Sequence, residues 1–212
     1  MEADFWHGKW SRGETGFHKE EAHPLLMAHV DVLNLSAGAR VFVPLCGMTL
    51  DIPWLHAQGY RVVGAELSQQ GVEALFQRMG VTPDVAEVGA MTRYRFEGIE
   101  IFVGDVFDLS AEGLGPIDAI YDRAALVALP DEMRRRYAGH LATLSDTAPQ
   151  LVITFDYDQS AMKGPPFSVP RAEVERLYGA AYQITSLASV PVEGGLKGKC
   201  PAMEEVWVLR GR

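Results

Sequence analysis

Short apolar runs recur along the chain at a spacing that predicts the strands of a sheet. Each run is five to seven residues long, and most are rich in Val or Ile. Runs of this length, bounded by turn residues, are typical of strands with buried faces. The most apolar run, Leu151–Phe155, is expected to lie inside the sheet rather than at its edge. The predicted strands are Arg40–Leu45, Tyr60–Glu66, Ile99–Val103, Ile117–Tyr121, Leu151–Phe155, Tyr182–Leu187 and Glu204–Leu209.

Helices are predicted between most of these strands. Ser68 can cap a helix that runs to Met79, where Gly80 supplies the left-handed residue that ends it. Pro130 is suited to the first position of another helix. This helix is predicted over 131–144, and two more are predicted over 51–58 and 171–178. Alternating strands and helices predict a doubly wound α/β fold, with a mostly parallel sheet covered on both faces. The last two strands have no strong helix between them and predict an antiparallel edge hairpin.

The composition is that of one globular domain. Of the 212 residues, 48% are hydrophobic and 22% are charged. No repeat or Pro/Gly/Ser-rich linker divides the chain. We therefore expect a single domain over residues 1–212, with residues 1–35 forming an N-terminal helical or lid segment that covers the ligand site.

Charge and cysteine usage narrow the class of partner. Acidic residues outnumber basic ones by 28 to 19, which gives a net charge of −9 and no electrostatic footprint for nucleic acid or an anionic membrane. No run of 18 apolar residues occurs, and Met1–Trp6 is acidic where a signal peptide would be basic and then apolar. Cys46, Cys200 and the six histidines show no metal-binding spacing. We expect a cytoplasmic monomer without a metal, which binds a small molecule.

The ligand of such a fold binds outside the carboxyl ends of the strands. The turn after the first strand contains one glycine, Gly47, so it is neither a GxGxxG motif nor a P-loop, although Gly47 can let the backbone approach a ligand. Glu66 ends the second strand 19 residues later, close to the spacing at which a carboxylate binds the ribose diol of a nucleotide. An ordinary turn and a solvated glutamate are the alternatives.

Two further strand ends carry polar residues. Asp105 follows the third strand and could accept from an adenine amino group, while Val106 or Phe107 packs on the base. Asp122 and Arg123 follow the fourth strand, where they form either part of a ligand cleft or a local ion pair at the rim of the sheet. Together these positions suit an adenosine cofactor without a pyrophosphate. S-adenosylmethionine fits, and NAD fits less well.

Several motifs taken together resemble the thiopurine S-methyltransferase family in its compact bacterial form, over nearly the whole chain. The turns Pro-Leu-Cys-Gly and Asp-Arg-x-Ala-Leu and the loop Gly-Pro-Pro-Phe are more specific together than any one of them. The residues that carry the resemblance are Phe5-Trp6, Trp10, Gly16–His18, Val41–Gly47, Val63–Glu66, Tyr121–Val127 and Gly164–Pro170. The resemblance implies a Rossmann-like class I methyltransferase that uses S-adenosylmethionine and releases S-adenosylhomocysteine.

The resemblance also implies roles for individual residues. Cofactor contacts are carried onto Trp10, Leu45, Glu66 and Arg123, with Asp105 and Val106 around the adenine. Phe17 and the Gly164–Phe167 loop, with Pro165 and Phe167, would border the acceptor pocket. The late region that supplies a basic residue in the family is short here, so Lys197 and Lys199 are only loose candidates.

Other residues have two interpretations each. Trp6, Trp10, Phe17 and His18 form a lid over the cofactor or pack the N-terminal segment on the sheet. Asp122 could orient Arg123, which holds an anionic acceptor or the cofactor carboxylate, and His18 is the candidate base to test. Cys46 is interpreted as a small buried residue and Arg134–Arg136 as a solvated face.

The leading hypothesis is an S-methyltransferase for thiopurines and similar small, soft nucleophiles, such as aromatic thiols or compounds of selenium or tellurium. The acceptor would be a thiol or another chalcogen compound, which attacks the methyl carbon in line and displaces S-adenosylhomocysteine. The alternative is a non-catalytic module that binds or senses S-adenosylmethionine. An NAD-dependent oxidoreductase is disfavoured by the missing GxGxxG motif.

Overall fold

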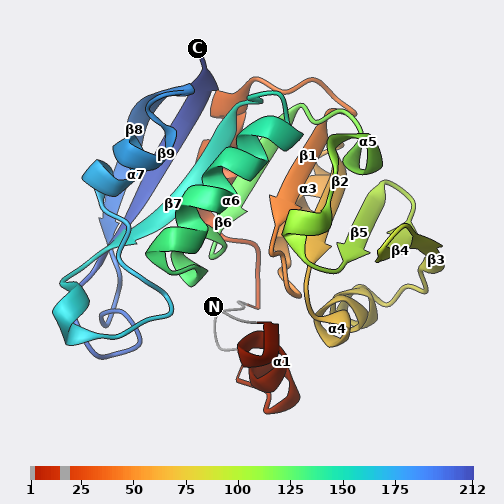
Figure 1. Ribbon diagram of the computed structural model, residues 1–212, viewed down its shortest axis with the longest axis horizontal. Coiled ribbons are helices and arrows are strands. Elements are labelled where there is room, and N and C mark those ends of the chain that lie inside the picture. Colours follow the sequence, from red (N-terminus) through yellow and green to blue (C-terminus); the bar gives the residue numbers. More distant parts are fainter. Residues whose placement is uncertain (1–2, 15–19) are drawn as a thin grey trace. The chain divides into compact units, whose positions relative to one another are not determined.

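The computed structural model describes residues 3–14 and 20–212 (Figure 1). The chain divides into two compact units, Met1–Ile120 and Tyr121–Arg212, which are described separately. The boundary falls within one strand, β6 (Ala119–Arg123). The expectation of a single domain, with residues 1–35 as a covering segment, stays a prediction.

Unit 1 is built on three parallel strands, β1 (Arg40–Pro44), β2 (Arg61–Glu66) and β5 (Ile99–Val103). β2 lies between β1 and β5, and the first residues of β6 pair with β1 in the same direction. Pro44 is opposite Ala65, and Glu66 is opposite Val103, so the three strands end at one edge. The chain therefore leaves β1, β2 and β5 side by side, as the strand-end rule requires.

An antiparallel hairpin extends this sheet beyond β5. Its strands are β3 (Asp84–Val88) and β4 (Met91–Phe96), and β4 pairs with β5. The hydrophobic pattern did not predict this hairpin, because β3 is an edge strand that exposes four of its five residues. A strand that buries neither face lacks the regular apolar pattern from which strands are predicted.

The helices of unit 1 begin and end where their capping residues place them. α4 (Gln69–Met79) has Ser68 as its N-cap, which accepts from the Gly71 N–H, and Gly80 at φ 70° as its C-cap. Both caps were predicted. The other helical segments are α1 (Ala3–Ser11), α2 (Pro24–His29), η1 (Val30–Leu33), α3 (Asp51–Ala57), η2 (Val106–Asp108) and α5 (Ala111–Leu114).

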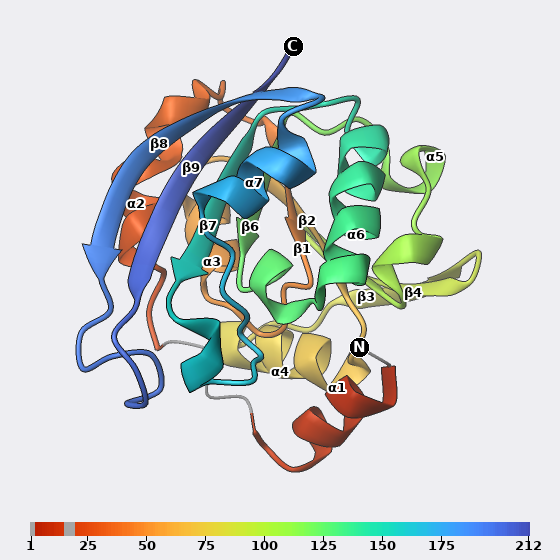
Figure 2. The same ribbon diagram turned by 60° about the vertical axis from the view of Figure 1, so that its left-hand side comes forward.

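Unit 2 contains the antiparallel pairs β7–β9 and β9–β8. The strands are β7 (Gln150–Asp156), β8 (Tyr182–Pro191) and β9 (Met203–Gly211), and the predicted hairpin of the last two strands is confirmed. Figure 2 shows β8 and β9 as a long curved pair, with α7 (Arg171–Tyr178) across the strands and α6 (Asp131–Leu144) beside it. Two short helices, η3 (Leu126–Ala128) and η4 (Gln159–Ala161), lie in the connections.

Together the elements form an α/β fold with a mostly parallel central sheet and antiparallel additions, so the predicted fold class is confirmed. One boundary matters for the site. β6 runs two residues further than expected, so Asp122 and Arg123 are its last two residues rather than the start of the following turn.

The core of unit 1 allows no side chain at Gly64 of β2. A Cβ atom built there would lie 2.7 Å from Cδ1 of Ile101 and 2.9 Å from Sγ of Cys46. We expect Gly64→Ala to lower the free energy of unfolding by about 1–3 kcal/mol, because neighbouring groups must shift to make room. Chemical denaturation measures this loss.

Gly139→Ala is the matched control, because a Cβ atom at Gly139 in α6 meets nothing within 4 Å. It should raise the free energy of unfolding by about 0.5–1 kcal/mol through helix propensity. A Gly64→Ala protein as stable as wild type would contradict this account of the core.

Candidate active site

The centre of the candidate site in unit 1 is the carboxylate of Glu66, at the end of β2. Its Oε2 atom accepts a hydrogen bond from the Gly47 N–H at 2.8 Å, and its Oε1 atom accepts one from the Ser68 N–H at 2.8 Å. The residue is only 7% exposed. Burial raises the pKa of Glu66 because it disfavours the charged form, while the backbone N–H donors oppose this rise. One side chain thus joins the turn after β1 to the turn after β2.

The turn after β1 has the backbone geometry that brings Gly47 to this carboxylate. Leu45 lies at φ 48° and Gly47 at φ 54°, both in the left-handed region. A non-glycine residue in this region is uncommon and costs free energy, so the surrounding structure must hold it there. The Cys46 N–H donates to the Ala65 carbonyl at 3.0 Å, which fastens the turn to β2.

Cys46 has the structural role that was expected of it. Its side chain is buried, and its sulfur lies against Gly64. Burial, and secondarily the charge of Glu66, raises the pKa of the Cys46 thiol well above its usual value. The thiol therefore stays protonated, whereas the thiolate is the nucleophilic form.

The end of β5 joins the same edge through a backbone contact. The Gly104 N–H donates to the Glu66 carbonyl at 2.9 Å. Asp105 follows and caps η2, because its Oδ1 atom accepts from the Phe107 N–H at 3.0 Å. Asp105 is exposed and Val106 is buried. Their assignment to the adenine stays a prediction, and the cap leaves the second carboxylate oxygen of Asp105 to serve it.

Trp10 of α1 is fixed at the start of α4. The indole is 5% exposed and lies on Gly71, where a built Cβ atom would be 2.7 Å from its Cζ2 atom. Gly71 lies in the first turn of α4, so Trp10 packs on the helix that directly follows the Glu66 turn. Trp10 thus packs α1 on helix α4 rather than on the sheet, and a covering role stays a prediction. Phe17 and His18 lie outside the described residues.

In unit 2, Asp122 is fully buried, and both of its carboxylate oxygens accept hydrogen bonds. Its Oδ2 atom accepts from the Tyr137 hydroxyl at 2.7 Å, and its Oδ1 atom accepts from the Leu126 N–H at 3.1 Å. Burial raises the pKa of Asp122 to about 6. Arg123 is half-buried, and Ala124 after it lies at φ 62°. These contacts hold the turn, whereas the orientation of Arg123 by Asp122 stays a prediction.

The Gly164–Phe167 loop is held on several sides within unit 2. The Phe167 N–H donates to the Val127 carbonyl at 2.6 Å, and the Tyr157 hydroxyl donates to the Pro166 carbonyl at 2.7 Å. Lys197, a loose candidate from the late region, donates from Nζ to the Pro165 carbonyl at 2.8 Å. The predicted acceptor loop is therefore a built element, although its substrate role stays a prediction.

The expectation of a solvated basic face on α6 is wrong for Arg134 and holds for Arg135 and Arg136. Arg134 is 8% exposed and donates to the Leu129 carbonyl at 2.8 Å and to Glu173 of α7 at 3.1 Å. Its guanidinium carbon lies 5.9 Å from the centre of the Phe167 ring. This burial could not be predicted from the helix alone, because Phe167 lies 33 residues away in the chain.

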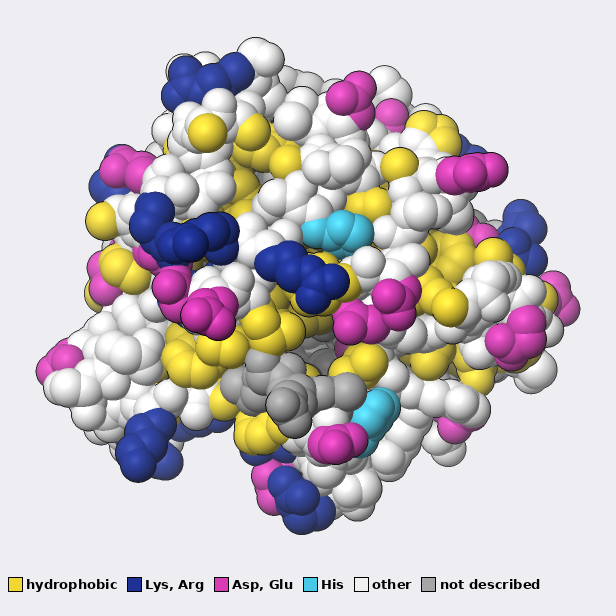
Figure 3. Space-filling model, viewed as in Figure 1, with side chains coloured by type: hydrophobic (Ala, Val, Ile, Leu, Met, Phe, Trp, Pro, Cys, Tyr) yellow, Lys and Arg dark blue, Asp and Glu magenta, His cyan; other side chains and the backbone are white. Residues whose placement is uncertain are grey.

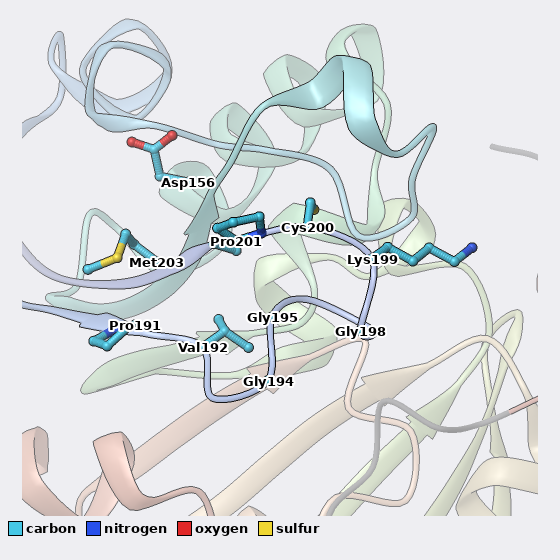
Figure 4. A pocket seen from close by; sticks show the side chains of 11 residues that line it. Asp156, Pro191, Val192, Gly194, Gly195, Gly198, Lys199, Cys200, Pro201 and Met203 are labelled. Atoms are coloured by element: carbon cyan, nitrogen blue, oxygen red, sulfur yellow. The ribbon is translucent and has the colours of Figure 1, made fainter.

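A hollow of about 560 Å³ occurs in unit 2, at the connection between β8 and β9 (Figure 4). Its lining consists of Asp156, Pro191, Val192, Gly194, Gly195, Lys199 and neighbouring residues up to Met203. Figure 4 shows the Lys199 side chain reaching away from Asp156 and Met203. None of the predicted cofactor residues lines this hollow, so it is not the cofactor site expected from the sequence.

The surface carries charges of both signs. On the face drawn in Figure 3, basic and acidic side chains are interspersed. Within residues 3–14 and 20–212, no group of three or more His, Cys, Asp or Glu side chains could hold a metal ion. No helix in the described part of the chain is both long and apolar enough to cross a membrane.

The fold is that of S-adenosylmethionine-dependent methyltransferases. One solved structure with this fold is the 1,6-didemethyltoxoflavin-N1-methyltransferase of Burkholderia thailandensis, with bound 1,6-didemethyltoxoflavin and S-adenosylhomocysteine. The similarity has a TM-score of 0.65 at 17% identity and covers 99% of this chain and 87% of that one.

Sequence relatives define the family within that class. A thiopurine S-methyltransferase of Xanthobacter autotrophicus is 54% identical over 210 residues, which is 99% of each chain. One of Gluconobacter oxydans is 54% identical over 205 residues, covering 97% of this chain and 93% of its own. The family model for thiopurine S-methyltransferase matches residues 1–210. The chain belongs to the thiopurine S-methyltransferase family and is an S-adenosylmethionine-dependent methyltransferase, as the resemblance in its motifs implied.

Gly71→Ala tests the seat of Trp10. The new methyl group would occupy space now filled by the indole, so α1 should detach from α4. We expect backbone amide exchange in residues 3–11 to rise about tenfold, which hydrogen-exchange mass spectrometry measures. Gly8→Ala in α1 is the control, because its Cβ atom would meet only the flexible end of Arg12. Unchanged exchange in Gly71→Ala would show that Trp10 does not hold α1.

Proposed function

We propose that this protein transfers the methyl group of S-adenosylmethionine to thiopurines and other small, soft nucleophiles. The acceptors include aromatic thiols and compounds of selenium or tellurium. Membership of the family, and the names of the relatives from Xanthobacter and Gluconobacter, support the thiopurine acceptor. We further propose that it acts in the cytoplasm as a monomer, without nucleic acid, membrane or metal.

The observation that carries the cofactor part of the proposal is the position of the Glu66 carboxylate. Its oxygens accept the N–H groups of Gly47 and Ser68 at 2.8 Å each, and the backbone of Leu67 also stabilises the charged form. An ionised carboxylate has about four acceptor positions in all, so acceptor capacity remains that suits the hydroxyls of a ribose. The turn has one glycine rather than a phosphate-binding loop, which fits a nucleoside without a pyrophosphate.

S-adenosylmethionine, when bound, supplies a methyl group on a sulfonium with an excellent leaving group. The residues of the chain then have to align the acceptor with that methyl group, which contributes several kcal/mol and up to about 7–11 kcal/mol in ideal cases. Water exclusion favours attack by a thiolate, because two opposite charges disappear in the reaction. An aromatic face near the sulfonium contributes about 0.5–2 kcal/mol, and Trp10 is our candidate for it.

The other residues take the roles that the family resemblance implies. Asp105 and Val106 surround the adenine, and Leu45 and Gly47 line the cofactor from the β1 turn. Phe17, Pro165 and Phe167 border the acceptor. No residue of the protein is proposed as a nucleophile, because a soft acceptor with a lowered pKa needs no covalent intermediate. His18 is the residue to test as a base.

Glu66→Ala tests the ribose contact. We expect S-adenosylhomocysteine to bind more weakly by about 1–3 kcal/mol, because charged hydrogen bonds to the ligand are lost. Isothermal titration calorimetry measures the difference, with Glu112→Ala in the exposed first turn of α5 as control. An unchanged dissociation constant in Glu66→Ala would remove Glu66 from the cofactor site.

Arg123→Ala tests whether this arginine holds an anionic group of the reactants. We expect kcat/KM for methyl transfer to fall about tenfold or more, while the free energy of unfolding stays near that of wild type. Arg135→Ala, on the exposed face of α6, should keep wild-type kinetics. Full activity of Arg123→Ala would refute its assignment.

The same methyl-transfer assay separates the enzyme from the sensing module. Binding of S-adenosylmethionine without methylation of a thiopurine, a thiol or a selenium compound would favour the non-catalytic alternative. Thermal stabilisation by NAD but not by S-adenosylhomocysteine would contradict both and favour an NAD-dependent oxidoreductase.

A further inference from the structure

Two predicted substrate-side elements of unit 2 are attached to one short piece of chain, residues 122–129, here called the 122–129 segment. Arg123 lies near its start. The carbonyl of Val127, further along the segment, accepts the hydrogen bond from the Phe167 N–H at 2.6 Å, so the last residue of the acceptor loop is bound to the same segment. A displacement of this segment would therefore move both elements.

Helix α6 fastens the segment near both ends. The Tyr137 hydroxyl donates to Oδ2 of Asp122 at 2.7 Å, and Nη1 of Arg134 donates to the Leu129 carbonyl at 2.8 Å. Tyr137 and Arg134 are three residues apart and therefore project from one face of the helix. Both side chains are buried, at 0% and 8% exposure.

Asp122 passes the contact with Tyr137 on to the backbone of the segment. Its second oxygen, Oδ1, accepts from the Leu126 N–H at 3.1 Å and closes the turn that contains Arg123. Ala124 within that turn lies at φ 62°, a conformation that a non-glycine residue keeps only when it is held. The carboxylate is thus the link between α6 and the strained turn.

We propose that Tyr137 is a positioning residue for methyl transfer, which holds the Asp122 carboxylate and through it the turn of Arg123 and the seat of Phe167. This inference rests on the proposed function. Tyr137 touches neither reactant in this account and acts only through Asp122.

The charge state of Asp122 gives this role a measurable pH dependence. The titratable groups that face Asp122 are Tyr137 from α6 and Tyr178 from α7, and Arg123 follows it on β6. Burial raises the pKa of Asp122 to about 6, and the bond from Tyr137 opposes that rise. Loss of the Tyr137 hydroxyl therefore raises the pKa of Asp122 further. A neutral carboxyl group is a weaker acceptor for the Leu126 N–H, so the turn loosens at a higher pH.

The test compares Tyr137→Phe with Tyr178→Phe. Both tyrosines are buried, but the Tyr178 hydroxyl has no hydrogen-bond partner among the described residues, so its removal is a matched control. Methyl transfer to a thiopurine is measured from about pH 5 to pH 9. We expect Tyr137→Phe to lower kcat/KM about tenfold at neutral pH. The decrease of kcat/KM on the acidic side of the profile should also occur at a higher pH than in wild type. Tyr178→Phe should follow the wild-type profile.

A stability measurement verifies the contact independently of activity. Asp122 has a raised pKa in the folded state, so its stabilising contribution is present at low pH and is lost as the pH rises through about 6. In Tyr137→Phe the folded-state pKa of Asp122 is higher, so this stabilising contribution is lost over a range that extends to a higher pH. The destabilisation relative to wild type should therefore be larger at about pH 8 than at about pH 5.

The outcomes distinguish a failure of the positioning role of Tyr137 from a failure of the proposed function. An active wild type, with a Tyr137→Phe profile that keeps the wild-type acidic side, would overturn the positioning role and leave the proposed function intact. A wild type without methyl transfer would reject the proposed function, and the positioning role with it. If Tyr137→Phe does not fold, Asp122→Asn replaces it. In Asp122→Asn the decrease of kcat/KM toward low pH should be smaller than in wild type, because asparagine does not titrate. A decrease as large as that of wild type would overturn the inference.

Discussion

The Glu66 carboxylate is the constraint on which the candidate cofactor site depends. Its two oxygens bind backbone N–H groups of Gly47 and Ser68, at 2.8 Å each, and so hold together the turns that leave β1 and β2. A buried carboxylate is costly unless its acceptor positions are used. Backbone donors meet part of this need, and the raised pKa of Glu66 shows that burial still dominates. A ligand with two vicinal hydroxyls would satisfy the rest.

Unit 2 also contains a buried carboxylate at a strand end, that of Asp122. Asp122 is a buried carboxylate that binds a phenol and a backbone N–H, and it holds a turn with a left-handed alanine. Both units thus place an acidic side chain at a strand end and use it to fix a turn that would otherwise be strained. In each case, an acidic residue that the sequence placed in the candidate site binds a backbone N–H of a neighbouring turn.

Much of the fold could be predicted from the sequence, because its strands are short apolar runs and its helices have explicit caps such as Ser68 and Gly80. The β3–β4 hairpin could not, because β3 is an exposed edge strand. Glu66 was found from its spacing to Gly47, but not its bonds to two turns, which depend on the left-handed Leu45. The buried roles of Arg134 and Tyr137 were missed, because their partners are distant in sequence and a polar residue on a helix resembles a solvated one.

The central claim is that the ribose of the cofactor is bound by Glu66 at the ends of β1 and β2. A crystal structure with S-adenosylhomocysteine tests it most directly. The account predicts both ribose hydroxyls within hydrogen-bond distance of the Glu66 carboxylate, about 2.5–3.0 Å, with the Gly47 and Ser68 contacts retained. A nucleoside bound elsewhere, or a ribose that does not touch Glu66, would contradict it.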